Sequence, residues 1–286
     1  MTPSDFDYLR KMLRERSGLV LAAEKQYLAE SRLLPVARRY GMTDLTALIS
    51  NIRMQPTSQL AIDTVAAMTT NETFFFRDKA PFENFRDHIM PALVAARGRE
   101  KRIRIWCAAA STGQEPYSLA MTLNEMGPAL AGFRVEIIST DLSGDVIDRA
   151  KAGLYSQFEV QRGLPIQQLL KYFTQEGESW RIAPAIRAMV QFRTLNLLND
   201  FSPLGTFDVV FCRNVLIYFD QETKIGVFNR IARQIPDDGY LVLGAAETVV
   251  GLTDAFKPMT ERRGLYTPNP AQRRASPMTQ FANAKV

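Results

Sequence analysis

The residues best suited to hold a ligand lie in the stretch 104–119, which reads RIWCAAASTGQEPYSL. An apolar run ends at Cys107, a loop of small residues follows, and Glu115 stands at the start of an expected helix. A strand, a small-residue turn and a helix in this order let the backbone approach a ligand and turn free N–H groups toward it. Only Gly113 matches the glycine-rich dinucleotide fingerprint. The stretch predicts a nucleotide-type binding turn or, alternatively, an ordinary tight strand-to-helix turn.

Other polar residues are candidates for the same ligand. Asp141 ends the second apolar run, where an acid accepts hydrogen bonds from ribose hydroxyls. The alternative is that Asp141 caps the following helix, 144–152. Asn71, Thr73 and Arg77 flank three consecutive phenylalanines, which we expect to form an apolar plug between two domains. The three polar side chains are then left to face a ligand.

Alternating strands and helices must position these residues. Short apolar strands are expected at 103–107, 134–139, 207–212 and 240–244, with a last pair near 248–268, and helices at 115–126, 143–152 and 221–235. This alternation predicts an α/β fold with a doubly wound parallel sheet and a ligand at the carboxyl ends of the strands. The interruption at about 157–193 predicts an inserted β-subdomain, with strands at 180–182 and 188–193.

The first 70 residues contain only helical patterns. Ser4 or Asp5 is expected to cap a first helix that Gly18 stops, and a second helix over 23–40 should be kinked or divided by Pro35. Two more helices are expected at 43–54 and 58–68, with Ile62 among the core residues. A linker helix over 80–97 then leads to the sheet.

A basic stripe runs along the second helix. Lys25, Arg32 and Arg39 are seven residues apart, and Arg38 widens the stripe. The net charge is +5 and the isoelectric point is about 9.2. The stripe is either a solvated face or a docking surface for an acidic partner helix.

Composition limits the class of protein. The 286 residues contain no apolar stretch of the ~20 residues that a membrane span needs, and the N-terminus is too charged for a signal peptide. Cys107 and Cys212 lie in apolar runs, which favours buried thiols and a reducing compartment over a disulfide or metal site. The expected organisation is a helical domain (1–70), a ligand-contacting stretch with the linker helix (71–98), an α/β domain (99–268) and a disordered tail (269–286).

Taken together, several ordered motifs carry a family resemblance: TTNETFFFRD, WCAAASTGQEPYSLA, STDLS, RTLNLL and FDVVFCRNVLIYF. They resemble the chemotaxis receptor methyltransferases, the CheR family, over about residues 1–268. The resemblance implies a class I, Rossmann-like methyltransferase that uses S-adenosylmethionine and releases S-adenosylhomocysteine. It further implies that the enzyme esterifies glutamate side chains on the cytoplasmic helices of bacterial chemoreceptors, in chemotactic adaptation.

The resemblance also implies site residues. The cofactor pocket would comprise Asn71, Thr73, Arg77, Glu115, Asp141, Asn196, Leu197, Arg213 and Asn214. Asp141 would hold the ribose hydroxyls, Asn196 and Leu197 would face the adenine, and Glu115 would lie on the side of the amino acid moiety. The receptor-docking residues would be Lys25, Arg32, Arg38 and Arg39. The loop 175–179 is shorter than the glycine-rich loop of members that tether to a receptor's C-terminal pentapeptide, so tethering is not expected.

The implied chemistry needs no general base, because a glutamate carboxylate is already ionised near neutral pH. This agrees with the presence of only one histidine, His88, for which we expect a structural or exposed role. Arg77 is the candidate to orient a carboxylate, and Tyr218 is the candidate hydroxyl near the transferred methyl, unless it is a core aromatic. We expect a cytoplasmic monomer without a metal.

Two other functions stay open at this stage. The same fold could methylate RNA or a small molecule, although no nucleic-acid-binding module is visible. Alternatively, the chain could be a cofactor-binding sensor or adaptor without turnover.

Overall fold

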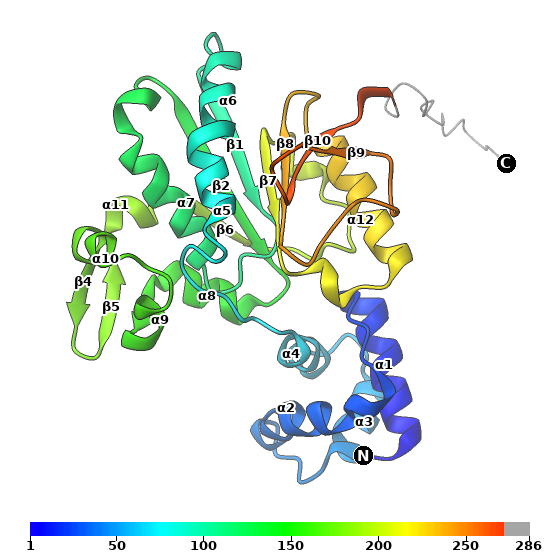
Figure 1. Ribbon diagram of the computed structural model, residues 1–286. Coiled ribbons are helices and arrows are strands. Elements are labelled where there is room, and N and C mark those ends of the chain that lie inside the picture. Colours follow the sequence, from blue (N-terminus) through cyan, green and yellow to red (C-terminus); the bar gives the residue numbers. More distant parts are fainter. Residues whose placement is uncertain (272–286) are drawn as a thin grey trace, which may run out of the picture.

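The seven-stranded sheet at the centre of the molecule is mostly parallel (Figure 1). The computed structural model describes residues 1–271. In spatial order the strands are β6 (Val190–Thr194), β2 (Arg134–Asp141), β1 (Arg102–Cys107), β7 (Val209–Cys212), β8 (Tyr240–Leu243), β10 (Leu265–Pro268) and β9 (Phe256–Pro258). The first five strands run parallel, whereas β10 is antiparallel to both neighbours. The strand order reverses between β1 and β7, and ligands of open α/β sheets bind at such a switch point.

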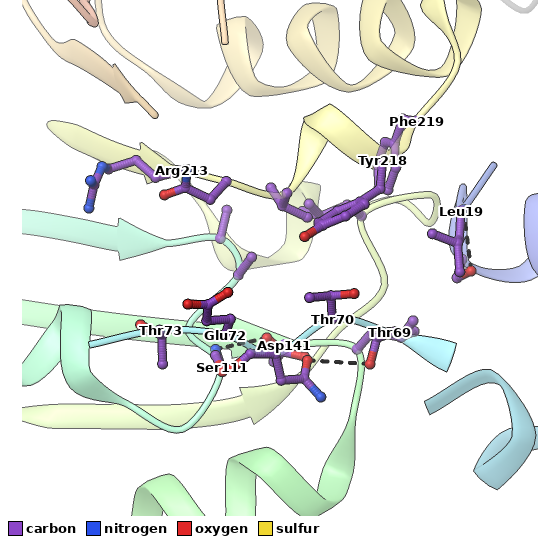
Figure 2. Close-up of a pocket in the computed structure, with 18 of the residues that line it drawn as sticks. Leu19, Thr69, Thr70, Glu72, Thr73, Ser111, Asp141, Arg213, Tyr218 and Phe219 are labelled. Carbon is purple, nitrogen blue, oxygen red and sulfur yellow. Dashed lines mark hydrogen bonds between the residues drawn. The ribbon is translucent and has the colours of Figure 1, made fainter. Parts of the chain in front are cut away.

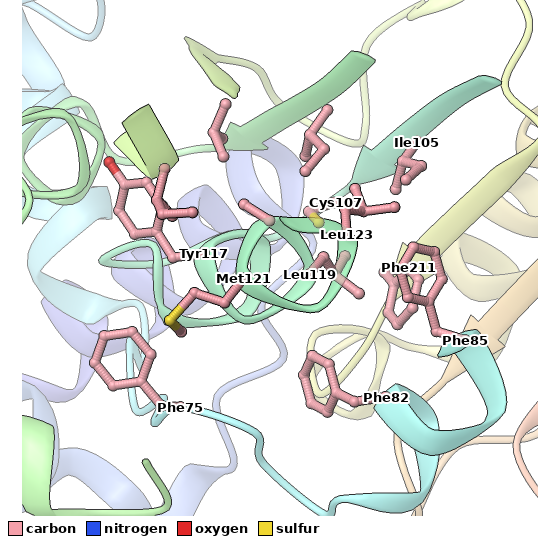
Figure 3. Close-up of a cluster of buried hydrophobic side chains, with 14 of the residues drawn as sticks. Phe75, Phe82, Phe85, Ile105, Cys107, Tyr117, Leu119, Met121, Leu123 and Phe211 are labelled. Carbon is pink, nitrogen blue, oxygen red and sulfur yellow. The ribbon is translucent and has the colours of Figure 1, made fainter. Parts of the chain in front are cut away.

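Both faces of the sheet are covered, and the strands β7 and β8 are accordingly apolar and buried along their whole length. Successive residues of β1 point to opposite faces: Ile105 belongs to one buried cluster and Trp106 to the other. On the first face lie the buried helix α7 (Gln114–Glu125) and the linker helix, and Figure 3 shows how Phe82 and Phe85 approach Phe211 there. The other helices beside the sheet are α8 (Gly144–Ala152) and α12 (Gln221–Gln234).

The linker helix has an interruption that the sequence pattern did not predict. It comprises α5 (Ala80–Asn84), a π-helical turn (Phe85–Ile89) and α6 (Met90–Ala96). Short 3₁₀ turns lie at Gly127–Leu130, Ser202–Leu204 and Leu216–Tyr218. The last of these follows the carboxyl end of β7, and it contributes directly to the site described below.

The inserted subdomain is a separate antiparallel sheet. Its order is β3 (Leu154–Ser156), β5 (Ser179–Ile182) and β4 (Phe173–Glu176), accompanied by α9 (Gln157–Gln161), α10 (Ile166–Tyr172) and α11 (Pro184–Arg187). The prediction that 188–193 belongs to this insertion is wrong, because β6 pairs with β2 at the edge of the main sheet. A short strand that follows an insertion carries no local signal of which sheet it joins.

The phenylalanine plug lies at a different interface from the one expected. Phe75 is fully buried, with ring centroids 5.1 Å from Tyr155 and 5.5 Å from Phe173. These partners belong to the inserted sheet, so Phe75 joins that sheet to the main core. It does not join the helical domain to the α/β domain.

The helical domain contains α1 (Pro3–Ser17), a 3₁₀ turn (Ala23–Lys25), α2 (Gln26–Arg39), α3 (Leu45–Met54) and α4 (Gln59–Met68). Thr2, and neither Ser4 nor Asp5, is the N-cap of α1, and Asp5 completes a capping box. Gly18 ends this helix with φ 75°, as expected. Pro35 does not divide α2.

One predicted core residue of the helical domain is exposed. Ile62 is 53% exposed, whereas the other core residues predicted for α3 and α4 are buried. The expectation for the tail, 269–286, falls outside the described residues from 272 onward. None of the helices within residues 1–271 is both long and apolar enough to cross a membrane.

The helical domain is fixed to the carboxyl edge of the main sheet by direct hydrogen bonds. The N–H of Val20 donates to the carbonyl of Tyr218 at 2.9 Å. The side-chain amide of Asn196 donates to the carbonyl of Arg16 at 2.6 Å. These contacts place the end of α1 beside the loops that follow β6 and β7, and a cavity lies between them.

Candidate functional site

The cavity has a volume of about 930 Å³, counted with its open mouth. Ten of the residues predicted from the sequence line it: Asn71, Thr73, Arg77, Glu115, Asp141, Asn196, Leu197, Arg213, Asn214 and Tyr218. Figure 2 shows Arg213 at one end and Leu19, from the helical domain, at the other, with Tyr218 above Asp141. The structure therefore brings together residues that come from five separate segments of the chain.

The floor of the cavity is the small-residue turn between β1 and α7. Ser111 and Gly113 have φ values of 48° and 95°, so the chain turns through the left-handed region twice. At Gly113 an added Cβ would lie 3.0 Å from the Cβ of Ala150, which leaves no space for a side chain. The Ser111 hydroxyl donates to the carbonyl of Asn71 at 2.7 Å, and its N–H donates to Asp141 Oδ2 at 2.9 Å. Ser111 thus ties three of the predicted segments together.

Asp141 presents a buried carboxylate to the cavity. It is 8% exposed, and its Oδ1 accepts the N–H of Ser143 at 3.1 Å. Burial raises the pKa of Asp141, while backbone N–H donors from Ser111, Leu142 and Ser143 counteract part of that rise. The N-cap of α8 is Ser143, so Asp141 does not cap that helix. Each carboxylate oxygen keeps capacity to accept a further hydrogen bond, an arrangement that suits two neighbouring hydroxyl donors.

Glu115 and Arg213 form a buried ion pair at the opposite end. Arg213 Nη1 donates to Glu115 Oε2 at 2.7 Å, and Nη2 donates to Asp78 Oδ2 at 2.7 Å and to the carbonyl of Arg77 at 2.9 Å. The Arg213 side chain is 1% exposed. Burial raises the pKa of Glu115, and the nearby guanidinium opposes the rise. Both Arg213 Nη atoms therefore donate to the protein, while its Nε–H has no partner among the described residues and Glu115 Oε1 keeps its acceptor capacity.

The loop that carries Arg77 is strained. Phe76, Asp78 and Lys79 have φ values of 51°, 69° and 47°, which L-residues adopt at a cost. Arg77 Nη1 donates to the carbonyl of Glu72 at 2.9 Å, and its guanidinium lies 5.6 Å from the centroid of the Phe74 ring. The bonds from Arg213 hold this loop against the cavity. Backbone strain that surrounding contacts hold in place is typical of functional loops.

The remaining wall comes from the loops after β6 and β7. The Asn196 amide donates to Arg16, and its Oδ1 accepts the N–H of Leu198 at 2.9 Å, so this side chain links the domains. Leu197 adds an apolar surface. Tyr218 is half-buried, and its hydroxyl has no hydrogen-bond partner among the described residues. It lines the cavity and is not a core aromatic.

Sequence reasoning missed Ser111 and Glu247. Glu247 does not line the cavity, but its carboxylate accepts N–H groups from Asn214 and two following residues. It stands just after the carboxyl end of β8, as Asp141 stands at the end of β2. The rule that singled out Asp141 could therefore have found Glu247.

The four basic residues of the predicted stripe divide into two pairs. Arg32 donates to the carbonyls of Met68 and Thr69 at 2.7 and 3.0 Å, and Arg39 pairs with Asp63 at 2.6 Å. These two arginines hold α2 to α4 and to the connector that enters the site. Lys25 and Arg38 are exposed and have no ion pair within the described part of the chain.

Other reactive side chains lie away from the cavity. Both cysteines are free and buried, and burial raises the pKa of the Cys107 and Cys212 thiols well above the usual value. His88 packs against Tyr240, and burial lowers its pKa. Within residues 1–271, no group of three His, Cys, Asp or Glu side chains could hold a metal ion.

Comparison with known proteins supplies the family. The family model described as CheR methyltransferase, SAM binding domain, matches residues 71–265. The model described as CheR methyltransferase, all-alpha domain, matches residues 4–69. Together they cover both the helical domain and the α/β domain.

Curated relatives match nearly the whole chain. Chemotaxis protein methyltransferase 1 of Pseudomonas aeruginosa is 44% identical over 260 residues, which cover 89% of this chain and 93% of the relative. Chemotaxis protein methyltransferase Cher2 of Pseudomonas putida is 40% identical, with coverages of 88% and 93%. Chemotaxis protein methyltransferase 1 of Vibrio cholerae is 38% identical, with coverages of 90% and 94%. The chain therefore belongs to the CheR family of S-adenosylmethionine-dependent methyltransferases.

Proposed function

We propose that this enzyme methyl-esterifies glutamate side chains of bacterial chemoreceptors during chemotactic adaptation. The observation that carries the proposal is the pair of buried acids, Glu115 and Asp141, which open into one cavity at the switch point of the sheet. Acids in these two places suit a ligand with an ammonium group at one end and a ribose diol further along, as in S-adenosylmethionine.

The cavity residues divide into three groups by what they offer such a ligand. Asp141 accepts hydrogen bonds from the ribose hydroxyls, and Glu115 accepts one from the ammonium group. Asn71, whose carbonyl accepts the Ser111 hydroxyl, and Thr73 border the same space. Because the Asn196 amide is already bonded within the protein, the Asn196–Leu197 segment meets the adenine through the Leu197 side chain and the backbone.

When bound, the cofactor supplies a methyl group on a sulfonium, which a carboxylate can attack directly. The chain then needs only to position two reactants and exclude water. Arg77 and Tyr218 both line the cavity. Arg77 would orient a carboxylate, and the Tyr218 hydroxyl, which has no partner among the described residues, would lie near the transferred methyl. The negative charge of the carboxylate and the positive charge of the sulfonium cancel as the methyl is transferred. A second cation bound tightly to the substrate carboxylate would stabilise the reactants more than the transition state and would slow the reaction.

We infer that Lys25 and Arg38 contact the receptor, since both are exposed and form no ion pair with any residue of the stretch 1–271. Arg32 acts on docking indirectly, through the connector that it holds. We further infer a monomer that works in the cytoplasm without a pentapeptide tether. The free buried thiols agree with a reducing compartment.

The proposal is tested by transfer of a radiolabelled methyl group from S-adenosylmethionine to purified receptor cytoplasmic fragments. We expect label in the receptor that mild alkali releases as methanol, because carboxyl esters hydrolyse easily. Alkali-stable label in receptor, label in added RNA, or no label with a cofactor that binds would each contradict the proposal. We expect the Arg77→Ala variant to fold and to transfer little label, which makes it the control.

A further inference from the structure

Glu247 receives an unusual number of backbone hydrogen bonds. Its Oε2 accepts the N–H groups of Asn214 and Gly244 at 2.7 and 2.8 Å. Its Oε1 accepts those of Val215 and Leu216 at 3.0 and 2.8 Å. The residue is 9% exposed and has no ion pair within the described chain. Four N–H groups therefore supply the solvation that this buried carboxylate loses.

Three of the donors form a nest, a concave run of successive N–H groups. Asn214 has φ 58°, and this left-handed residue lets the N–H groups of residues 214–216 converge on one anion. The left-handed conformation costs a non-glycine residue free energy, which the hydrogen bonds to Glu247 can offset. The ladder between β7 and β8 ends at Cys212 and Leu243. Beyond these two residues, Glu247 links the ends of β7 and β8, because its carboxylate accepts N–H groups from the residues that follow both strands.

The nest leads straight into two residues that line the cavity. Asn214 borders the cavity itself, and the 3₁₀ turn that starts at Leu216 carries Tyr218. The carbonyl of Tyr218 accepts the N–H of Val20 from the helical domain. A shift of the nest would therefore move two cavity-lining residues together with a backbone contact of the helical domain.

We propose that Glu247 is a positioning residue, which holds Asn214 and Tyr218 against the cofactor through the backbone amides of residues 214–216. The inference rests on the cofactor site proposed above. Gly244 supports it independently: an added Cβ there would lie 2.8 Å from Asn214 Nδ2 and 2.8 Å from Glu247 Oε2. The chain keeps glycine at the point where a side chain would open this contact.

The first test is Glu247→Gln, which keeps the shape but turns an NH₂ group toward backbone donors. We expect hydrogen exchange of the amides at 214–216 to accelerate by about tenfold or more, and the affinity for S-adenosylhomocysteine to fall by about tenfold. Circular dichroism verifies the fold. Glu100→Gln is the matched control, because Glu100 is exposed and lies just before β1, at the amino end of the strand and away from the nest.

The second test, Gly244→Ala, displaces the same contact without changing charge, so it should reproduce both effects. In an Asn214→Ala, Tyr218→Phe background, Glu247→Gln should cost less than about threefold in affinity, because coupled residues are not additive. Reduced thermal stability with unchanged exchange at 214–216, or with unchanged affinity, would overturn the positioning role. If the wild-type protein binds no S-adenosylhomocysteine, the proposed cofactor site fails, whereas the exchange data still decide whether Glu247 holds the nest.

Discussion

Asp141→Asn tests the assignment of the ribose site with little change of shape. In the structure one carboxylate accepts N–H groups from Ser111 and Ser143 and still faces the cavity. Asparagine keeps one oxygen, but its NH₂ group must replace the other. The variant therefore lacks one charged acceptor for a ligand hydroxyl, and its NH₂ group faces the N–H of either Ser111 or Ser143.

The magnitude follows from these contacts. A hydrogen bond to a charged group contributes about 1.5–3 kcal/mol, and an unsatisfied buried donor costs about 1–3 kcal/mol. Part of the second cost falls on the free protein as well. We therefore expect the affinity for S-adenosylhomocysteine to fall by about 2–4 kcal/mol, or roughly 30- to 700-fold.

The assay is calorimetric titration of wild-type and variant proteins with S-adenosylhomocysteine. Asp145→Asn is the matched control, because Asp145 is an exposed acid in the first turn of α8, close to Asp141 in the chain. An Asp141→Asn protein that is folded and binds within about threefold of wild type would refute the reasoning, since even one charged hydrogen bond is worth more than this.

Four further outcomes are expected. Because burial raises the pKa of Asp141 above 3.8, this acceptor is lost on acidification at a higher pH than for an ordinary aspartate. Titrations at decreasing pH should show affinity falling through that raised pKa, and Asp141→Asn should remove this component. Arg77→Ala should lower turnover by roughly 10²-fold through misplacement of a carboxylate, with a melting temperature close to that of wild type. Reversing the charges of Lys25 and Arg38 to Glu should raise KM for the receptor fragment and weaken its salt dependence, without changing S-adenosylhomocysteine affinity. Phe75→Ala should lower the free energy of unfolding by about 3–5 kcal/mol in denaturant titrations, because the ring is fully buried between two sheets.

Local patterns predicted the parts of the fold that local physics determines. The small-residue turn and the acid at the end of β2 were recognisable because both follow buried strands, and parallel strands bring their carboxyl ends together. The cofactor-site residues that the family resemblance implied all line one cavity. Their individual roles stay predictions until ligand binding is measured.

The features that could not be predicted depend on partners that are distant in the sequence. Nothing near β6 shows that it pairs with β2, and nothing near Phe75 shows that its ring meets Tyr155. Charge and spacing placed Arg32 on the basic stripe, but its donors are used by the end of α4. The position of Glu247 after β8 could have singled it out, but its backbone N–H partners lie 31 to 33 residues away, and a single sequence carries no sign of such pairing.

The most direct measurement of the central claim is to locate the transferred methyl group. Purified receptor fragment would be incubated with enzyme and S-adenosylmethionine carrying an isotopically labelled methyl, then digested at mildly acidic pH and sequenced by mass spectrometry. The account predicts label on glutamate side-chain carboxyls, absent with Asp141→Asn at limiting cofactor. Label on nitrogen atoms, or an unlabelled receptor in the presence of enzyme that binds the cofactor, would contradict it.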